Sequence, residues 1–319
     1  MEQQQQATLD LRPLETTHVH PPPNLARVSR FLTPSRYSPS RDGVNQNLLI
    51  LLHGLGDTAA PFAQLGHSLN LPQTAILSLQ GPERVPLLEE EAYQWWDSFT
   101  ELGELIPNPN PSATLHLLLS LLSHLTAPVS PSPSSSDKAA GTAGGCGWHP
   151  SQIHLFGYAQ GGTCAAELAL AWARAHPIPP PSSAGASSPS PSASPSPAQQ
   201  TPPGLTAHLG SLVSISAPLL SHPTPSPSTL ARTRALVLFR PGADERAVVP
   251  AAYQRGFVRA EAVKLPPGSG RGAEGMLRGR DEWERVMRFW SEVLGRKSAL
   301  ELSGEVYEVA QGSGAGAAR

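Results

Sequence analysis

The chain has 319 residues, which is enough for one large α/β domain or two small ones. Hydrophobic residues make up 39%, and the 35 prolines gather in a few stretches, so tails and insertions dilute a real core. The formal net charge of −2 gives no long-range attraction to nucleic acid or to an anionic membrane, and neither is an expected partner. The sequence has two cysteines, no apolar signal segment and no apolar run of membrane-spanning length, which predicts a cytoplasmic protein without a disulfide framework.

Segments rich in Gln, Pro, Ser, Ala and Gly punctuate the chain. Such segments bury too little apolar surface to offset the entropy of ordering them. We therefore predict one folded domain over residues 27–300, with a disordered tail over 1–26 and a loose tail over 301–319. His18 and His20 lie in the first tail with too few further ligands for a metal site, and we expect neither metal nor cofactor. The predicted flexible insertions are 127–145, 177–204 and 223–228.

Between these segments, strand patterns alternate with helical patterns. Residues 48–52 form a continuous apolar run, which is typical of a strand buried on both faces. The alternation predicts an α/β fold with a mostly parallel, doubly wound sheet and helices on both faces. The predicted strands are 48–52, 75–79, 153–156, 209–215, 235–239 and 262–265. The predicted helices are 61–70, 112–125, 161–176, 249–259 and 281–294.

One turn between a predicted strand and a predicted helix carries most of the chemical information. Residues 157–161 read Gly-Tyr-Ala-Gln-Gly, the frame of a G-x-S-x-G nucleophile elbow with Ala159 at the serine position. A methyl group has no oxygen with which to attack a carbonyl. In this frame the catalytic histidine follows the acid along the chain. The best acid candidate is Asp244, and the last histidine is His222, so the sequence predicts a hydrolase frame without nucleophile or histidine.

Five segments in chain order resemble the motifs of the acyl-protein thioesterase / phospholipase–carboxylesterase family of α/β-hydrolases. The first resembles the family's HG-x-G-D motif, the second its W-x-D segment beside the acyl pocket, and the third its GFSQGG elbow. The last two resemble its acid loop and its G-M-x-H segment, which places Asp244 at the acid and Arg278 at the histidine. With Ala159 and Arg278 at these positions, the chain resembles a catalytically degenerate member of the family, of a fungal type. The five segments are residues 51–58, 94–97, 157–162, 242–250 and 274–278.

The resemblance also implies an oxyanion hole made of backbone donors. One N–H comes from Gln160 and the other from the loop near Leu55. The helix that begins at Gly161 adds its positive dipole end at the same place. Side-chain replacements leave these donors intact, so a carbonyl or carboxylate oxygen can still dock. Trp95 and Trp96 either line an acyl groove or pack in the core.

Arg278 cannot replace a histidine base, because a guanidinium stays protonated. Beside Asp244 it has three interpretations. It pairs with the acid and holds two loops together, it favours an anionic ligand such as a fatty-acid carboxylate, or it points to solvent.

The expected function is a pseudoenzyme that binds an acyl or hydrophobic ligand, or a protein partner, without turnover. Two enzymatic alternatives stay open beside a purely structural scaffold. In one, Cys164, Thr163 or Ser216 is a relocated nucleophile served by a histidine such as His53, a residue that this motif more commonly uses to order its loop. In the other, the oxyanion hole and a bound water suffice for weak hydrolysis of a carboxylic ester or a palmitoyl-protein thioester.

Overall fold

The computed structural model describes most of the chain between His20 and Ser303, together with two short flanking strands. Asp244 and most of the three predicted insertions lie outside the described residues. The described residues are 10–13, 20–129, 144–177, 208–224, 230–242, 248, 250–267, 275–303 and 307–310.

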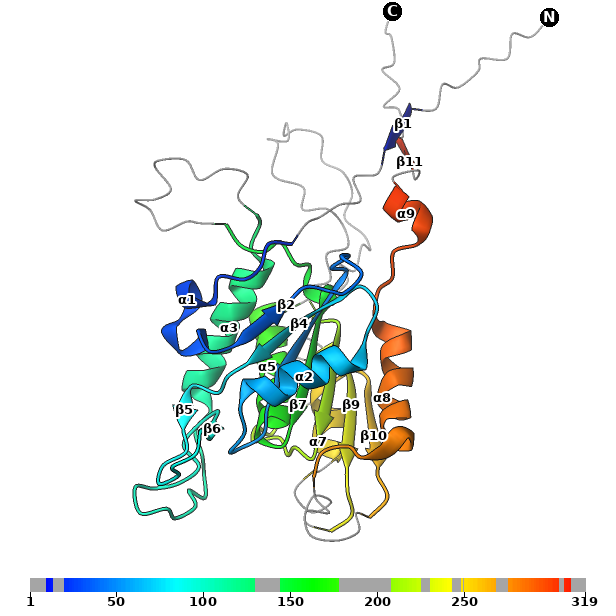
Figure 1. Cartoon of the computed structure of the whole chain (residues 1–319). Helices are drawn as coiled ribbons and strands as arrows, with labels where there is room; N and C mark the ends of the chain where they lie inside the picture. Colours follow the sequence, from blue (N-terminus) through cyan, green and yellow to red (C-terminus); the bar gives the residue numbers. More distant parts are fainter. Residues whose placement is uncertain are drawn as a thin grey trace, which may run out of the picture.

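A seven-stranded sheet forms the centre of the molecule (Figure 1). Its strands are β2 (Arg36–Ser38), β3 (Asn47–Leu52), β4 (Thr74–Leu79), β7 (Ile153–Tyr158), β8 (Ser211–Ile215), β9 (Arg234–Phe239) and β10 (Ala260–Lys264). They lie in the order β10-β9-β8-β7-β3-β4-β2. Every neighbouring pair is parallel except β2 and β4, which are antiparallel. The predicted mostly parallel α/β sheet is therefore confirmed.

Helices cover both faces of the sheet. The helices are α1 (Leu25–Val28), α2 (Ala59–Leu69), α3 (Ser112–Thr126), α5 (Gln160–Ala175), α7 (Pro250–Gly256), α8 (Gly279–Val293) and α9 (Ala299–Ser303). In β9, Ala235 and Val237 belong to the same core cluster as the buried residues of α3 and α5, whereas Leu236 and Leu238 belong to the cluster that includes those of α2 and α8. This two-residue alternation confirms the doubly wound arrangement. None of the described helices combines the length and the apolar character that crossing a bilayer requires.

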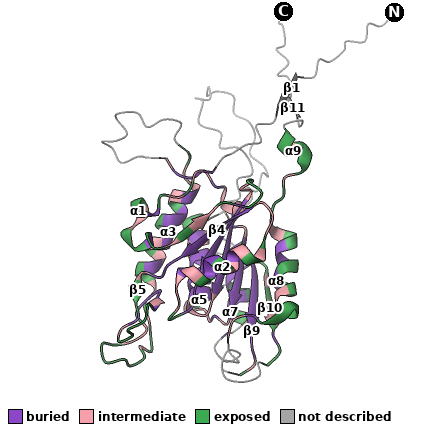
Figure 2. Ribbon diagram, in the orientation of Figure 1, coloured by how far each residue is buried: buried purple, intermediate pink, exposed green. Residues whose placement is uncertain are grey.

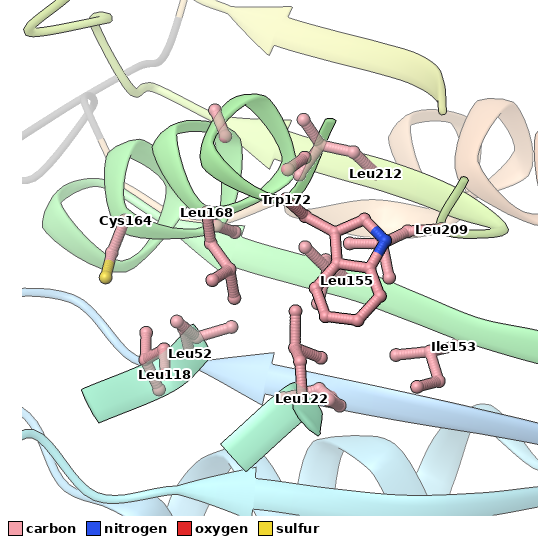
Figure 3. Packing of buried hydrophobic residues seen from close by; sticks show 14 of the residues in the cluster. Leu52, Leu118, Leu122, Ile153, Leu155, Cys164, Leu168, Trp172, Leu209 and Leu212 are labelled. Carbon is pink, nitrogen blue, oxygen red and sulfur yellow. The ribbon is translucent and has the colours of Figure 1, made fainter. Parts of the chain in front are cut away.

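The larger core lies between the sheet and the helix pair α3 and α5 (Figure 3). Leu168 of α5 faces Leu118 of α3, and Leu52 of β3 lies beside them. All three side chains are at most 1% exposed. Figure 2 shows the same division across the whole molecule, with a buried sheet between helices whose outer faces are exposed. Burial of α5 therefore fixes where its first turn lies relative to the ends of the strands.

The ordered body begins before the predicted boundary at residue 27. His20 is 5% exposed and stacks on Trp148, with ring centroids 3.7 Å apart. Its Nδ1 donates to the carbonyl oxygen of Cys146 at 3.0 Å. The polar composition of the tail does not reveal this contact, because the partners are more than a hundred residues away in the sequence.

Three short strand pairings also differ from the prediction. Asp10–Pro13 (β1) and Tyr307–Ala310 (β11), both predicted as parts of tails, form an antiparallel two-stranded sheet. Glu83–Arg84 (β5) and Tyr93–Gln94 (β6) pair in a second small sheet. The third pairing is that of β2, which has three residues, with β4. Strands of two to four residues are too short for an apolar period to identify them.

Leu168→Ala tests the burial of α5. Removal of a fully buried leucine leaves a cavity between α3 and the sheet, so we expect the free energy of unfolding to fall by about 2–5 kcal/mol. Urea denaturation measures the change. Leu300→Ala, at a position that is 62% exposed, is the matched control and should change stability by at most about 0.5 kcal/mol. Equal effects of the two substitutions would contradict the packing.

Candidate functional site

The turn between β7 and α5 has a strained backbone. Ala159 lies between Tyr158 and Gln160 with φ 48° and ψ −120°, a conformation that residues with a Cβ rarely adopt. Such a residue costs about 1–3 kcal/mol of strain. The N–H of Ala159 donates to the carbonyl oxygen of Ile215 at 2.8 Å. The structure therefore contains the sharp strand–turn–helix, and the residue at its tip carries a methyl group.

Close approach of backbones holds this turn in place. A Cβ added to Gly161 would lie 2.3 Å from the carbonyl oxygen of His53 and 2.4 Å from that of Leu52. A Cβ added to Gly157 would lie 2.3 Å from the carbonyl oxygen of Gly161. Neither position admits a side chain, because the atoms in the way belong to the backbone. Glycine at these positions lets the first turn of α5 pack directly on the end of β3.

His53 orders its loop and has no free ring nitrogen. Its Nδ1 donates to the carbonyl oxygen of Gly54 at 2.7 Å, and its Nε2 accepts from the N–H of Gly81 at 2.9 Å. The ring is fully buried, and burial lowers the pKa of His53. Both nitrogens are engaged in the neutral form, so His53 is not placed to serve as a base for a relocated nucleophile.

The loop that carries Leu55 lies beside the elbow. A Cβ on Gly54 would lie 2.9 Å from Cδ1 of Tyr158, so the tyrosine ring covers this part of the loop. Gly56, with φ 84°, donates its N–H to the carbonyl oxygen of Tyr93 at 2.9 Å. Leu55 between them is 40% exposed. The structure thus brings the predicted donor segments at Leu55 and Gln160 together, at the carboxyl ends of the adjacent strands β3 and β7.

The side chain of Gln160 holds the segment that carries Trp95 and Trp96, a role that no sequence motif indicates. Its Oε1 accepts from the N–H of Trp95 at 2.8 Å, and its Nε2 donates to Oγ of Ser98 at 2.8 Å. Trp95 is fully buried and donates its Nε1–H to the carbonyl oxygen of His53 at 2.8 Å. Trp96 is 7% exposed. Between the two interpretations of this pair, burial favours core packing over an open groove.

The segment that carries Arg278 is held by an ion pair between a buried arginine and a partly buried glutamate, which no sequence motif indicates. Arg240, 3% exposed, donates from Nη1 and Nη2 to the two carboxylate oxygens of Glu282 at 2.8 and 2.9 Å. The same guanidinium donates to the carbonyl oxygen of Pro266 at 3.0 Å. Glu282 also accepts from the backbone N–H of Arg278 at 2.5 Å, at the start of α8. An arginine at the end of the apolar run of β9 was the only sequence signal.

Arg278 itself is exposed, and Asp244 lies outside the described residues. The pairing of Arg278 with Asp244, one of its three interpretations, therefore stays a prediction. What the structure adds is that the Arg278 position begins a helix and is anchored through its backbone.

The candidate relocated nucleophiles differ in their surroundings. Cys164 is fully buried inside α5, and burial raises the pKa of its thiol. Thr163 donates its hydroxyl to the carbonyl oxygen of Pro218 at 2.6 Å. Ser216 follows β8 with φ 51°, and its enclosed Oγ has no hydrogen-bond partner among the described residues. Burial and bonding thus argue against Cys164 and Thr163. The enclosure of its Oγ also argues against Ser216, although that hydroxyl has no hydrogen-bond partner among the described residues.

The parallel sheet, the helices on both faces and the sharp turn after β7 define an α/β-hydrolase fold. The family model described as Phospholipase/Carboxylesterase matches residues 39–178. A hydrolase of Mycosarcoma maydis, named uncharacterized hydrolase UM10204, is 35% identical over 276 residues, which are 86% of each chain. The chain belongs to the phospholipase/carboxylesterase family.

Two further similarities are weaker. An uncharacterized hydrolase of Schizosaccharomyces pombe, C9G1.08c, is 36% identical over 84 residues, which cover 25% of this chain and 35% of that protein. The crystal structure of Zea mays acyl-protein thioesterase 2 has a TM-score of 0.47 and 16% sequence identity, and covers 82% of this chain and 99% of that chain.

Ala159→Gly tests the strain at the elbow. Glycine adopts the observed φ without a steric penalty but loses more entropy on folding, so we expect a net gain of about 1 kcal/mol in the free energy of unfolding. Ala173→Gly, within the regular part of α5, is the matched control and should lower stability by about 1 kcal/mol. Urea denaturation compares the two. Destabilisation of similar size at both positions would contradict the strained turn.

Glu282→Gln tests the buried ion pair. The hydrogen bonds and charge of Arg240 lower the pKa of Glu282 below its usual 4.5. The carboxylate therefore stabilises the folded chain above that usual value, and the contribution is lost as pH falls through the lowered pKa. We expect a loss of about 2–3 kcal/mol at pH 7, which shrinks as the pH falls below 4.5.

Denaturant unfolding at several pH values measures this difference. Glu284→Gln is the matched control, since the Glu284–Arg288 pair is exposed and worth at most about 1 kcal/mol. A pH-independent effect of Glu282→Gln would show that the loss has another origin.

Proposed function

We propose that this chain is a pseudoenzyme of its family, which binds an acyl or hydrophobic ligand, or a protein partner, without turning it over. The observation that carries the proposal is the methyl group of Ala159 at the tip of the elbow. A serine hydroxyl there would be the nucleophile, its proton would pass to a histidine, and an acid would orient that histidine. Ala159 offers no oxygen and no proton.

The second substitution acts in the same direction. Arg278 takes the place that the resemblance gives to the histidine, and a guanidinium accepts no proton at neutral pH. In a serine protease, loss of such a triad costs about 10⁶-fold in turnover and leaves roughly 10³–10⁴-fold over water from the oxyanion hole and binding. The chain is therefore expected to bind at this site far better than it hydrolyses.

The binding half of the site supports the proposal. The backbone N–H of Gln160 lies in the first turn of α5. N–H groups there lack intrahelical partners, and the helix dipole is positive at this end. The loop at Leu55 lies across from it, at the end of the adjacent strand β3. A carbonyl or carboxylate oxygen of a ligand would accept from these donors. Nothing in this step requires a side chain at Ala159 or an imidazole at Arg278.

A weak or relocated ester or thioester hydrolase is the second candidate, and one observation favours it. Ser216 lies at the carboxyl end of β8, beside the elbow strand, and its hydroxyl has no hydrogen-bond partner among the described residues. Because that hydroxyl is enclosed, attack on a substrate would require its surroundings to open. Ser216→Ala distinguishes the candidates. Any activity of the natural chain that depends on Ser216 would be abolished, whereas the pseudoenzyme proposal expects no activity to lose.

The test compares the natural chain, Ala159→Ser, and Ala159→Ser with Arg278→His. Each is assayed with a short-chain aryl ester and a palmitoyl thioester, and with a serine-directed fluorophosphonate. We expect the natural chain to be inactive and unlabelled. The double variant should gain both labelling and turnover, because only it regains the serine and the histidine of the triad.

Turnover of the natural chain within the ordinary enzymatic range, roughly 1–10³ s⁻¹, would refute the pseudoenzyme proposal. A folded double variant that stays silent would refute the placement of Arg278 at the histidine position.

A further inference from the structure

Four exposed leucines lie in a projecting segment whose base contacts the elbow. The segment from β5 to the start of α3 projects from the lower left of the body and is coloured largely as exposed (Figure 2). Leu87 is 74% exposed, Leu88 51%, Leu102 84% and Leu105 71%. A single exposed leucine is common, but four within one projecting segment are not, and clustered apolar exposure often marks a contact surface. We refer to residues 83–106 as the leucine finger.

Two loops of the finger form one unit. In the second loop, the N–H of Thr100 donates to the carbonyl oxygen of Glu104 at 2.8 Å, and the N–H of Ile106 donates to that of Ser98 at 2.9 Å. This makes a hairpin with Leu102 near its tip. A Cβ on Gly103 would lie 3.3 Å from Cδ1 of Leu87, so the first loop touches the hairpin. The two loops therefore lie against each other at Leu87, and each carries exposed leucines.

The finger is strongly acidic. It has seven carboxylates and one arginine, whereas the whole chain has a net charge of −2. All seven carboxylates are exposed, and none forms an ion pair with a described residue. The arginine, Arg84, donates to the backbone carbonyl oxygens of Glu89 and Glu90 at 3.2 Å each. The carboxylates are Glu83, Glu89, Glu90, Glu91, Asp97, Glu101 and Glu104.

Hydrogen bonds tie the finger to the elbow. Gln160, the first residue of α5, bonds both the N–H of Trp95 and the hydroxyl of Ser98, where the hairpin begins. The N–H of Tyr93 donates to the carbonyl oxygen of Asp57 at 3.2 Å, in the loop that follows β3. The base of the finger is therefore anchored at the candidate binding site.

We propose that the leucine finger docks a cationic amphipathic segment of another protein, one with Lys or Arg beside a stripe of apolar side chains. The leucines supply apolar area for the stripe, and the surrounding carboxylates complement its positive charges. The same carboxylates would be repelled by an anionic bilayer, which argues against a lipid surface. The inference rests on the proposed binding function and names the chemistry of its partner.

The test uses the full chain and three fluorescein-labelled 18-residue peptides in an anisotropy titration. One peptide is a Lys/Leu amphipathic helix, one replaces Leu with Ser, and one replaces Lys with Glu. We expect the Lys/Leu peptide to bind at least about tenfold more tightly than either of the others. Its affinity should also fall as salt rises.

Finger variants identify the surface. Leu87→Ser with Leu102→Ser should weaken the Lys/Leu peptide about tenfold or more. The triple variant Glu89→Gln, Glu90→Gln and Glu91→Gln should weaken binding of the Lys/Leu peptide and reduce the salt dependence of its affinity. Val258→Ser with Leu300→Ser is the matched control, since these residues are 55% and 62% exposed outside the finger and should leave binding unchanged.

Equal binding by the finger variants and the natural chain would overturn the proposal, as would equal binding of the Lys/Ser peptide. Finger-dependent sedimentation with phosphatidylcholine/phosphatidylserine vesicles would replace the partner with a membrane, and finger-dependent self-association would replace it with a second copy. Hydrolysis assays on the same samples separate the two proposals. Turnover by the natural chain refutes only the pseudoenzyme proposal. Failure of the natural chain to bind the Lys/Leu peptide through the finger, without turnover, refutes only the docking proposal.

Discussion

The first turn of α5 packs against the end of β3 with no room for a side chain between them, and the rest of the site depends on that contact. Gly161 lies against the carbonyl oxygens of Leu52 and His53, and Gly157 lies against Gly161 in turn. Because the helix and strand meet so closely, the single residue that joins β7 to α5 is held at φ 48°. The strain at Ala159 is present although its methyl group offers no oxygen for attack. Strain of this kind survives only where the surrounding packing over-determines it.

A satisfied polar network extends from the same contact. His53 bonds through both ring nitrogens, its carbonyl oxygen accepts from the indole of Trp95, and the amide of Gln160 bonds the backbone of that tryptophan and the hydroxyl of Ser98. Buried polar groups stabilise a fold only when such bonds are complete. The network therefore positions the loop at Leu55, the elbow and the base of the leucine finger without a catalytic serine. None of these hydrogen bonds involves the side chain of Ala159 or Arg278, as the proposed binding function requires.

Much of the fold was predictable, because its central strands are buried on both faces and its longer helices show their period. The apolar run at 48–52 became β3, and the glycine-flanked turn after 153–156 became the elbow. The sequence could not predict contacts made by single side chains across the fold. The stack of His20 on Trp148 and the pair of Arg240 with Glu282 both join distant residues with no local pattern. The choice between core and groove for Trp95 and Trp96 likewise required their burial.

The central claim is that no residue of the natural chain becomes acylated. Intact-protein mass spectrometry after incubation with an activated acyl ester tests it directly, since any acyl-enzyme adds the mass of one acyl group whichever side chain is modified. The account predicts an unmodified mass for the natural chain and a single adduct for Ala159→Ser with Arg278→His. A stoichiometric single adduct on the folded natural chain would contradict the account, provided that a chain denatured before incubation forms none. The position of the adduct would identify the true nucleophile.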